Sequence, residues 1–314
     1  MSVALPGWHL HLDTWLLVVA LAGAWAWSLR REQRRRGPGG EPVVTRAQRW
    51  SFLAGVVVLW AASDWPIHDL AEDYLYSVHM VQHLLMTLVA GLLLVAGTPG
   101  WLVARLLAPR WLRRPVRGLS RPVLNLVQFN LVLVVSHWPL VVDATLVHHP
   151  LHFVAHAVLV ASAVLMWLPV ASQSPLLPRL APPSQMVYLF LQTILPTVPA
   201  SFLTFGTTPL YPRYATFPRL WDLSVITDQQ IAGLVMKIGG GLFLWVVIAV
   251  VFFRWYEREE GGGRPRARGQ ATPPAPLALT RAGPGEDGPG DPELTWEAVE
   301  RELARLEGER RTPG

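Results

Sequence analysis

Residues 78–98, VHMVQHLLMTLVAGLLLVAGT, decide which kind of fold this chain adopts. The stretch contains no Asp, Glu, Lys or Arg, and it is long enough to cross a hydrocarbon core of about 30 Å, which takes about 20 residues. A segment in lipid must be helical, because a helix satisfies its own backbone polar groups. The stretch therefore predicts a transmembrane helix, and this helix begins with two histidines spaced four apart, His79 and His83.

Six more segments have the same character, and together they predict an all-α polytopic membrane protein with a bundle of seven transmembrane helices. The composition agrees, because 51% of the 314 residues are hydrophobic and only 16% are charged, against about 25% charged in soluble domains. The predicted spans cover residues 12–29, 47–63, 78–98, 122–142, 150–171, 185–206 and 228–253.

The placement of arginine predicts how these spans are oriented. The stretch RREQRRR at 30–36 follows the first span, and six arginines lie between the third and fourth spans, whereas the loops 64–77 and 143–149 contain no basic residue. Basic loops stay on the cytoplasmic side. The pattern predicts an N-terminus outside and a C-terminus in the cytoplasm, and it explains the basic balance without nucleic-acid binding.

The composition also divides the chain into two regions. Residues 1–258 form the predicted transmembrane domain, and residues 259–314 are rich in Gly, Pro, Arg and Ala, which predicts a disordered cytoplasmic tail. A short amphipathic helix near 293–308 is expected in this tail, either solvated or docked on a partner. The chain has no cysteine, which excludes disulfides, thiolate metal sites and cysteine nucleophiles.

In this topology all ten histidines are predicted on the outer side. Residues four apart share one helix face, so His79 pairs with His83 and His152 pairs with His156. Imidazole is the commonest side-chain metal donor and suits copper, zinc and iron. Ionisable residues in spans usually face the interior of the bundle. The sequence predicts a metal or haem site made by the following histidines: His79, His83, His137, His152 and His156.

Other polar residues at the same depth are candidates for supporting roles. Asp228 starts the seventh span, where the spacing of Thr227 and Gln230 predicts a capping box. Asp228 then complements the helix end, orients a histidine or binds metal through its carboxylate. Gly239 to Gly241 should allow close helix approach. The full set of supporting candidates is Asp143, Asp228, Lys237, Met80, His148 and His149.

Four motifs in this order resemble the CtaG-like family of assembly factors for caa-type cytochrome c oxidase. They are HMVQHLLM (79–86), SHWPLVVD (136–143), HHPLHFVAH (148–156) and TDQQIAGLVMKIGGGL (227–242). The resemblance covers about residues 10–255, and DQQxAGxxM from Asp228 is its most specific part. It implies a non-enzymatic protein of the bacterial plasma membrane that helps to build a haem-copper oxidase by delivering copper. The implied partners are oxidase subunits and other copper chaperones.

Three other functions remain open at this point. In a haem-b membrane cytochrome, one histidine from the third span and one from the fifth would bind iron from opposite faces. A copper permease would need metal donors or acidic residues that continue toward the inner side. A purely structural chaperone would use its histidines only for hydrogen bonds.

Overall fold

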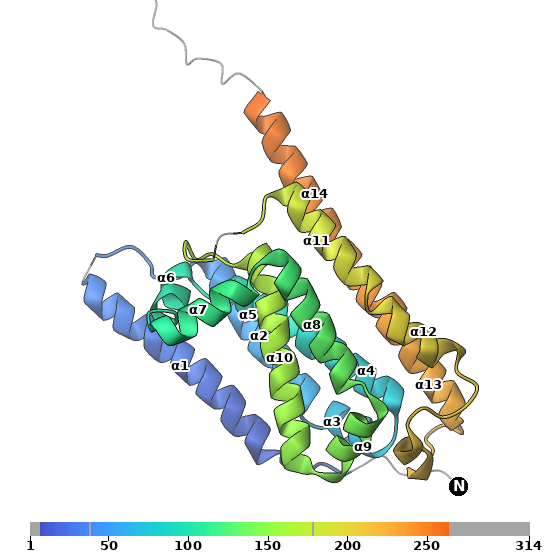
Figure 1. Cartoon of the computed structure of the whole chain (residues 1–314). Coiled ribbons are helices and arrows are strands. Elements are labelled where there is room, and N and C mark those ends of the chain that lie inside the picture. Colours follow the sequence, from blue (N-terminus) through green and yellow to red (C-terminus); the bar gives the residue numbers. More distant parts are fainter. Residues whose placement is uncertain (1–6, 38, 178, 264–314) are drawn as a thin grey trace, which may run out of the picture. The chain divides into compact units, whose positions relative to one another are not determined.

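The stretch at residues 78–98 lies at the centre of the helical bundle in the computed structural model, which describes residues 7–37, 39–177 and 179–263 (Figure 1). It folds as α4 (Tyr76–Leu84), a π-helical segment η1 (Leu85–Ala90) and α5 (Gly91–Gly97). Among the candidate spans of the described residues, this one is the most buried. Its apolar composition is therefore used for packing as well as for crossing a membrane.

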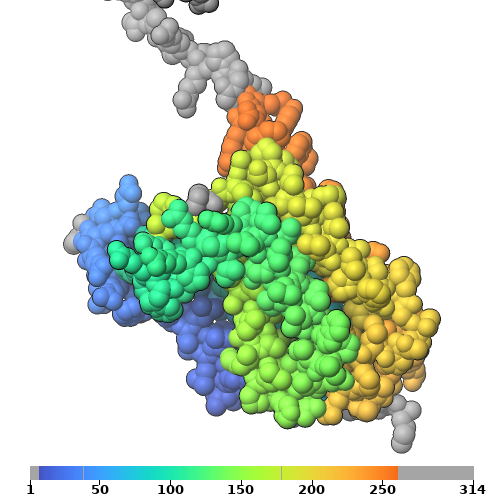
Figure 2. Space-filling view, viewed as in Figure 1, coloured from blue at the N-terminus to red at the C-terminus, as the bar shows by residue number. Residues whose placement is uncertain are grey.

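All regular elements of the described chain are helices, as the sequence predicts. The space-filling view shows α8, α10 and α11 on one face of the described bundle (Figure 2). The remaining elements are α1 (Leu12–Arg36), α2 (Arg46–Ser63), α3 (Ile67–Asp73), α6 (Gly100–Leu106), α7 (Arg110–Leu119), α8 (Pro122–Ser136), α9 (Pro139–Val147), α10 (His149–Ala171), α11 (Pro182–Ile194), α12 (Thr197–Phe205), the 3-10 turn η2 (Pro212–Thr216), α13 (Val225–Leu234), the π-helical η3 (Val235–Gly239) and α14 (Gly240–Gly263).

The number of candidate spans in the described chain is six, or seven if α7 and α8, which meet at 89°, count as one bent span. The fourth predicted span, 122–142, is not one continuous helix, because α8 ends at Ser136 and α9 starts at Pro139. Proline has no N–H, and its ring disfavours the helical conformation in the preceding residue. Trp138 accordingly has an extended ψ of 134°, and the helix breaks there.

Small residues bring the central span close to its neighbours. A Cβ atom built on Gly97 would lie 2.4 Å from the backbone nitrogen of Phe52 in α2, and one built on Gly240 would lie 3.2 Å from Leu84 Cδ2. Small residues at such crossings let helices pack closely in lipid. The close approach predicted for Gly239 to Gly241 is found at Gly239 and Gly240, whereas Gly241 faces open space.

The outer surface of the described helices is also apolar. Trp27 on α1 and Leu242 and Phe253 on α14 are each more than 60% exposed. An exposed apolar surface on helices that satisfy their own backbone groups is what lipid requires. The described residues therefore have the construction of a multi-pass membrane protein. From position 264 onward, the predicted tail, including the amphipathic helix near 293–308, lies outside the described residues.

Candidate metal centre

One end of the bundle, called here the histidine end, is formed by the starts of α1, α4, α10 and α13 together with α3 and α9 (Figure 1). Seven of the ten histidines form a continuous group of rings there, with neighbouring ring centroids 4.1–5.7 Å apart. Both i,i+4 pairs share a helix face as predicted, and the third and fifth predicted spans meet through their rings. The seven are His11 before α1, His68 on α3, His79 and His83 on α4, His137 after α8, and His152 and His156 on α10.

Three of these residues, called here the imidazole trio, are placed to share one ion: His79, His83 and His156. Each offers one ring nitrogen, and the three nitrogens lie within 4.8 Å of one another. Three nitrogens that each bind a metal at about 2.0 Å in one plane lie about 3.5 Å apart. The trio thus needs only small side-chain movements to surround an ion. Its members come from two helices, α4 and α10.

The ring of His137 fixes the orientation of His83. His137 Nδ1 lies 2.7 Å from the carbonyl oxygen of Leu133, which can only accept, so this nitrogen carries the proton. In the neutral ring His137 Nε2 is then an acceptor, and it receives His83 Nδ1–H at 3.2 Å. This sequence of bonds leaves the lone pair of His83 on Nε2, which faces His156 Nε2 at 2.9 Å. His137 therefore positions His83 Nε2, the nitrogen whose lone pair is free to bind a metal. Tyr211 holds His137 in turn by donating its hydroxyl hydrogen to the carbonyl oxygen of His137 at 2.8 Å.

His79 has a buried nitrogen with no hydrogen-bond partner among the described residues. The residue is only 4% exposed, and the atom concerned is Nδ1. Leaving a buried polar atom unsatisfied costs about 1–3 kcal/mol, and such atoms are rare in native proteins. A ligand that accepts the lone pair of this imidazole would remove the cost. The orphaned atom leaves His79 able to take one further partner.

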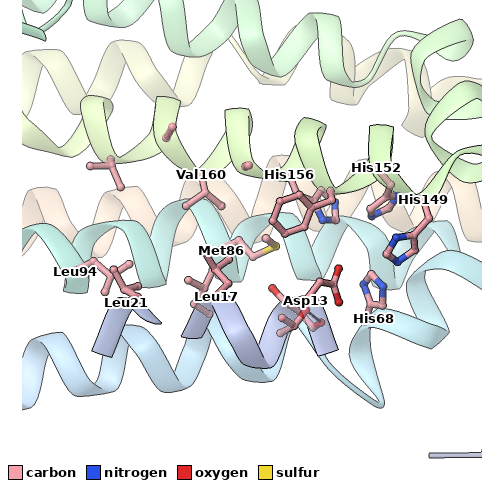
Figure 3. A pocket seen from close by; sticks show the side chains of 17 residues that line it. Asp13, Leu17, Leu21, His68, Met86, Leu94, His149, His152, His156 and Val160 are labelled. Atoms are coloured by element: carbon pink, nitrogen blue, oxygen red, sulfur yellow. Dashed lines mark hydrogen bonds between the residues drawn. The ribbon is translucent and has the colours of Figure 1, made fainter. Parts of the chain in front are cut away.

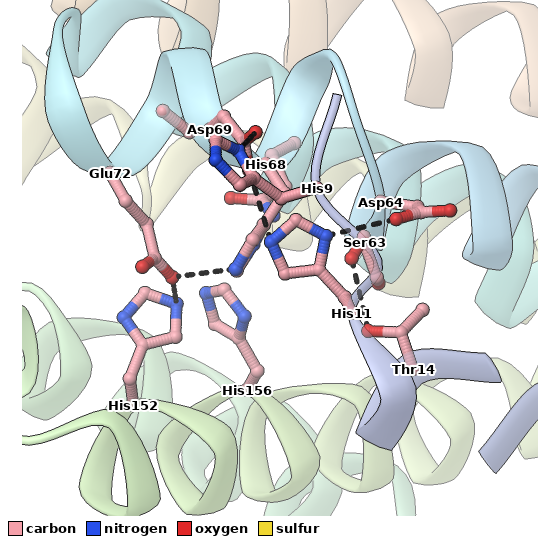
Figure 4. A network of polar contacts seen from close by, with 12 residues as sticks. His9, His11, Thr14, Ser63, Asp64, His68, Asp69, Glu72, His152 and His156 are labelled. Atoms are coloured by element: carbon pink, nitrogen blue, oxygen red, sulfur yellow. Dashed lines mark hydrogen bonds and ion pairs between the residues drawn. The ribbon is translucent and has the colours of Figure 1, made fainter. Parts of the chain in front are cut away.

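A second group, called here the carboxylate trio, lies beside the first and consists of His68, Glu72 and His152 (Figure 4). Glu72 Oε1 is 3.1 Å from His68 Nε2 and 2.7 Å from His152 Nε2. The sequence predicts His152 as a ligand together with His79 and His83, and its ring also lies 4.1 Å from that of His156. Its closest ionic partner, however, is Glu72. His152 thus lies at the junction of the two trios.

His68 and Glu72 lie in a segment that the sequence predicts as an outer loop, and Glu72 is not among the predicted site residues. Both lie on α3, a seven-residue helix in the segment predicted as a loop between the second and third spans. The spacing of His68 and Glu72 is i,i+4, the same signal that identified the histidine pairs. What the sequence does not reveal is that α3 packs against α4 and that Glu72 on α3 reaches His152 on α10. Tyr214 holds α3 in place by donating its hydroxyl to the carbonyl oxygen of Ala71 at 2.8 Å, and burial raises the pKa of this phenol well above its usual range.

An acidic edge lies next to the carboxylate trio, at the start of α1 (Figure 4). His11 Nδ1 is 2.9 Å from Asp64 Oδ1, and His11 Nε2 is 3.0 Å from Asp69 Oδ1. The ring of His11 also lies 4.6 Å from that of His68. Negative charge concentrated here raises the local concentration of cations.

Asp228 supports the imidazole trio from a different helix. It is 1% exposed, and its carboxylate accepts from the backbone nitrogens of Tyr76 at 2.8 Å and Ser77 at 3.0 Å. These are the first N–H groups of α4, which the helix itself leaves unsatisfied. The predicted capping box at Thr227 is wrong, because α13 begins three residues earlier and Ser224 caps it. Asp228 instead fixes the start of the helix that carries His79 and His83.

The other supporting candidates lie in various environments. Met80 is buried in an apolar cluster with Tyr76, Val142 and Met236. The Asp143 carboxylate, on α9, has one buried oxygen without a hydrogen bond among the described residues. Lys237 lies on η3 with its ammonium 5.8 Å from the ring centroid of Phe205. His148 and His149 are exposed at the junction of α9 and α10, and only His149 reaches the cavity described next.

A cavity of about 290 Å³ opens beside the two trios, between α1, α2 and α10 (Figure 3). Apolar side chains such as Leu17, Leu21 and Val160 line most of it. His68, His152 and His156 line the same cavity and lie together near one end of the view (Figure 3). The two trios are thus connected to an apolar space between helices.

These features define a class: a polytopic helical membrane protein with buried, neighbouring imidazole groups at one end of its bundle. The sequence profile of the cytochrome c oxidase caa3 assembly factor family matches residues 23–258. The chain therefore belongs to this family, which is the CtaG-like family that its motifs resemble, and its role is that of an oxidase assembly factor. Comparisons with curated proteins and with solved structures gave no match.

Proposed function

We propose that the imidazole trio binds Cu(I) as cargo and passes it to a subunit of the haem-copper oxidase that the family assembles. Two observations support the proposal: the imidazole trio brings three ring nitrogens within 4.8 Å of one another, and the buried Nδ1 of His79 has no hydrogen-bond partner among the described residues. Assembly by metal delivery involves no catalysis, and we propose none. In this proposal copper is the cargo of the protein and not a resident cofactor.

The charge of the site favours a monovalent ion. Neutral imidazoles contribute no negative charge, so the whole charge of a bound ion must be accommodated in a buried place, which is costly. A single positive charge costs less than a double one under these conditions. Copper as Cu(I) also accepts two or three donors, which matches the number that the trio offers. Histidine is a donor that suits copper.

The proposed route of delivery follows from topology and the cavity. The arginine pattern predicts that the histidine end lies at the outer face of the plasma membrane. His152 and His156 reach the apolar cavity beside α10, so an oxidase subunit in the same bilayer could approach the donors there. Copper would then leave by exchange of one imidazole at a time for ligands of the partner. The preferred partner is an oxidase subunit whose copper centre is still empty.

Removal of the trio should abolish tight Cu(I) binding. The purified full-length protein, titrated anaerobically against a coloured Cu(I) chelator, is expected to hold one Cu(I). The variant His79→Ala/His83→Ala/His156→Ala should hold none that competes with the chelator. His148→Ala is the matched control, because it removes an exposed imidazole at the end of α9, and it should bind like the unchanged protein.

Two further measurements complete this experiment: the folded state of the variant and the absorption spectrum of the unchanged protein. The triple variant must behave as a folded protein in size-exclusion chromatography and in thermal unfolding. If it does not, the single variant His79→Phe, which keeps the buried volume, replaces it in the Cu(I) titration. Equal Cu(I) retention by both proteins would overturn the proposal. A Soret band in the purified unchanged protein that disappears in His83→Ala would favour the haem-b alternative instead.

His137 should tune the affinity without being essential. Replacement by Phe removes the acceptor that holds His83 Nδ1–H, so His83 loses its fixed tautomer. Loss of such a supporting bond typically weakens metal binding by about 10–100-fold. We expect His137→Phe to lower Cu(I) affinity by this factor while the stoichiometry stays unchanged. Complete loss of binding would mean that His137 is itself a ligand.

A further inference from the structure

We infer that the carboxylate trio, His68, Glu72 and His152, is a second metal site that takes a divalent first-row ion such as Zn²⁺. Its donor atoms lie within 4.8 Å of one another, with two imidazole nitrogens and one carboxylate oxygen. His68 and His152 are buried, and Glu72 is half-buried. Two histidines and one carboxylate form a common set of protein ligands for zinc. The carboxylate trio shares no residue with the imidazole trio.

The charge balance separates the two sites. One carboxylate cancels one charge of a divalent ion, so the carboxylate trio would leave a net charge of +1 when it is filled. This is the same net charge that Cu(I) gives among three neutral imidazoles. The carboxylate trio therefore suits a divalent ion and the imidazole trio suits a monovalent ion, because a larger net charge would be costly to bury in either site. The adjacent Asp64 and Asp69 further favour a cation on the side of the carboxylate trio.

The surroundings of His68 contain a group suited to metal binding. Gln82 Nε2 lies 3.2 Å from His68 Nδ1 and 2.9 Å from the carbonyl oxygen of Ala62. Donation from Gln82 keeps the His68 proton on Nε2, which faces Glu72 in the metal-free protein. A metal at Nε2 requires the neutral tautomer of His68 that carries its single ring proton on Nδ1, so Nδ1–H then needs an acceptor. Gln82 Oε1 is buried with no hydrogen-bond partner among the described residues, and turning the amide over would bring it to this N–H at the cost of the bond from Gln82 Nε2 to the carbonyl oxygen of Ala62.

The position of the trio ties α3 to α10. His68 and Glu72 lie on one face of α3, and His152 reaches them from the first turn of α10. An ion bound there would fix the wall of the cavity where His68, His152 and His156 meet. Because His152 and His156 are adjacent on α10, the two sites remain close but use separate donor atoms.

The test is Zn²⁺ binding by the purified full-length protein, stripped with a chelator and then titrated by calorimetry. Glu72→Gln keeps the size of the side chain but removes the charged donor, and it should lower the Zn²⁺ affinity about 100-fold or more, since losing even a supporting group costs 10–100-fold. Asp73→Asn is the matched control, because it removes a carboxylate from the next residue, which is exposed. The control should bind Zn²⁺ like the unchanged protein.

Cu(I) titrations of the same proteins separate this inference from the proposed function. Glu72→Gln should retain Cu(I), and the triple variant of the imidazole trio should retain Zn²⁺. Unchanged Zn²⁺ affinity in Glu72→Gln overturns the second site, as does Zn²⁺ binding that is lost only with the imidazole trio. Absence of Zn²⁺ binding by the unchanged protein also overturns it. If Glu72→Gln does not fold, His68→Gln removes a different donor and must give the same loss.

Discussion

Replacing Gly233 by alanine is expected to destabilise the folded protein strongly. A Cβ atom at this position would lie 2.7 Å from the backbone nitrogen of Thr204 and 2.8 Å from the carbonyl oxygen of Ala200. Backbone atoms cannot turn aside, so α12 and α13 would have to separate. Overpacking typically costs 1–3 kcal/mol, and a clash with backbone should reach about 3 kcal/mol or more. Thermal unfolding in detergent should show a midpoint lower by about 10 °C.

The matched control is Gly241→Ala in the same predicted span. Its Cβ atom would meet nothing within 4 Å, and alanine favours a helix over glycine by up to about 1 kcal/mol. Gly241→Ala should therefore accumulate and melt like the unchanged protein or slightly higher. Equal behaviour of the two variants would show that α12 and α13 do not cross at Gly233.

Replacing Asp228 by alanine should destabilise the protein and weaken Cu(I) binding together. The change leaves the N–H groups of Tyr76 and Ser77 buried without an acceptor. Each such group costs about 1–3 kcal/mol, and the loss of a negative charge near the positive end of α4 adds to it. Because α4 carries His79 and His83, a displaced first turn moves both imidazoles. Thermal unfolding and Cu(I) competition should be measured on the same sample.

Asp228→Asn distinguishes a capping role from direct metal binding. Asparagine keeps one oxygen that can accept from one of the two N–H groups, so its effect on stability should be less than that of alanine. If Asp228 acts only by holding α4, Cu(I) affinity should follow stability through the series. A full loss of Cu(I) binding by Asp228→Asn with normal stability would instead make this carboxylate a ligand.

The sequence was sufficient to predict most of the helical architecture. Long apolar segments such as 78–98 and 150–171 have few alternatives in lipid, because unsatisfied backbone groups are excluded there. Pro139 could have predicted the break in the fourth span, but the apolar run continues through it and concealed the boundary. The π-helical segments η1 and η3 have no comparable signal in their residues. They shift the register of the spans without changing their composition.

The candidate site was predictable only in part, for a similar reason. The pairs His79/His83 and His152/His156 follow from helical spacing, and their meeting follows from their common depth. The association of His152 with Glu72 does not, because it depends on how α3 packs between the spans. The role of Asp228 at the start of α4 is likewise a contact between residues far apart in the chain. Local sequence patterns describe a helix face, whereas partners across helices depend on tertiary packing.

The imidazole trio, in a chain without cysteine, consists of donor side chains that should resist oxidising conditions. Thiolate carriers can lose their ligands to disulfides or sulfenic acids, and they then need enzymes that reduce them again. Imidazole rings form neither disulfides nor sulfenic acids. The donor set of His79, His83 and His156 is therefore the same in reducing and in aerated surroundings. These three side chains therefore need no companion reductase to stay available as donors.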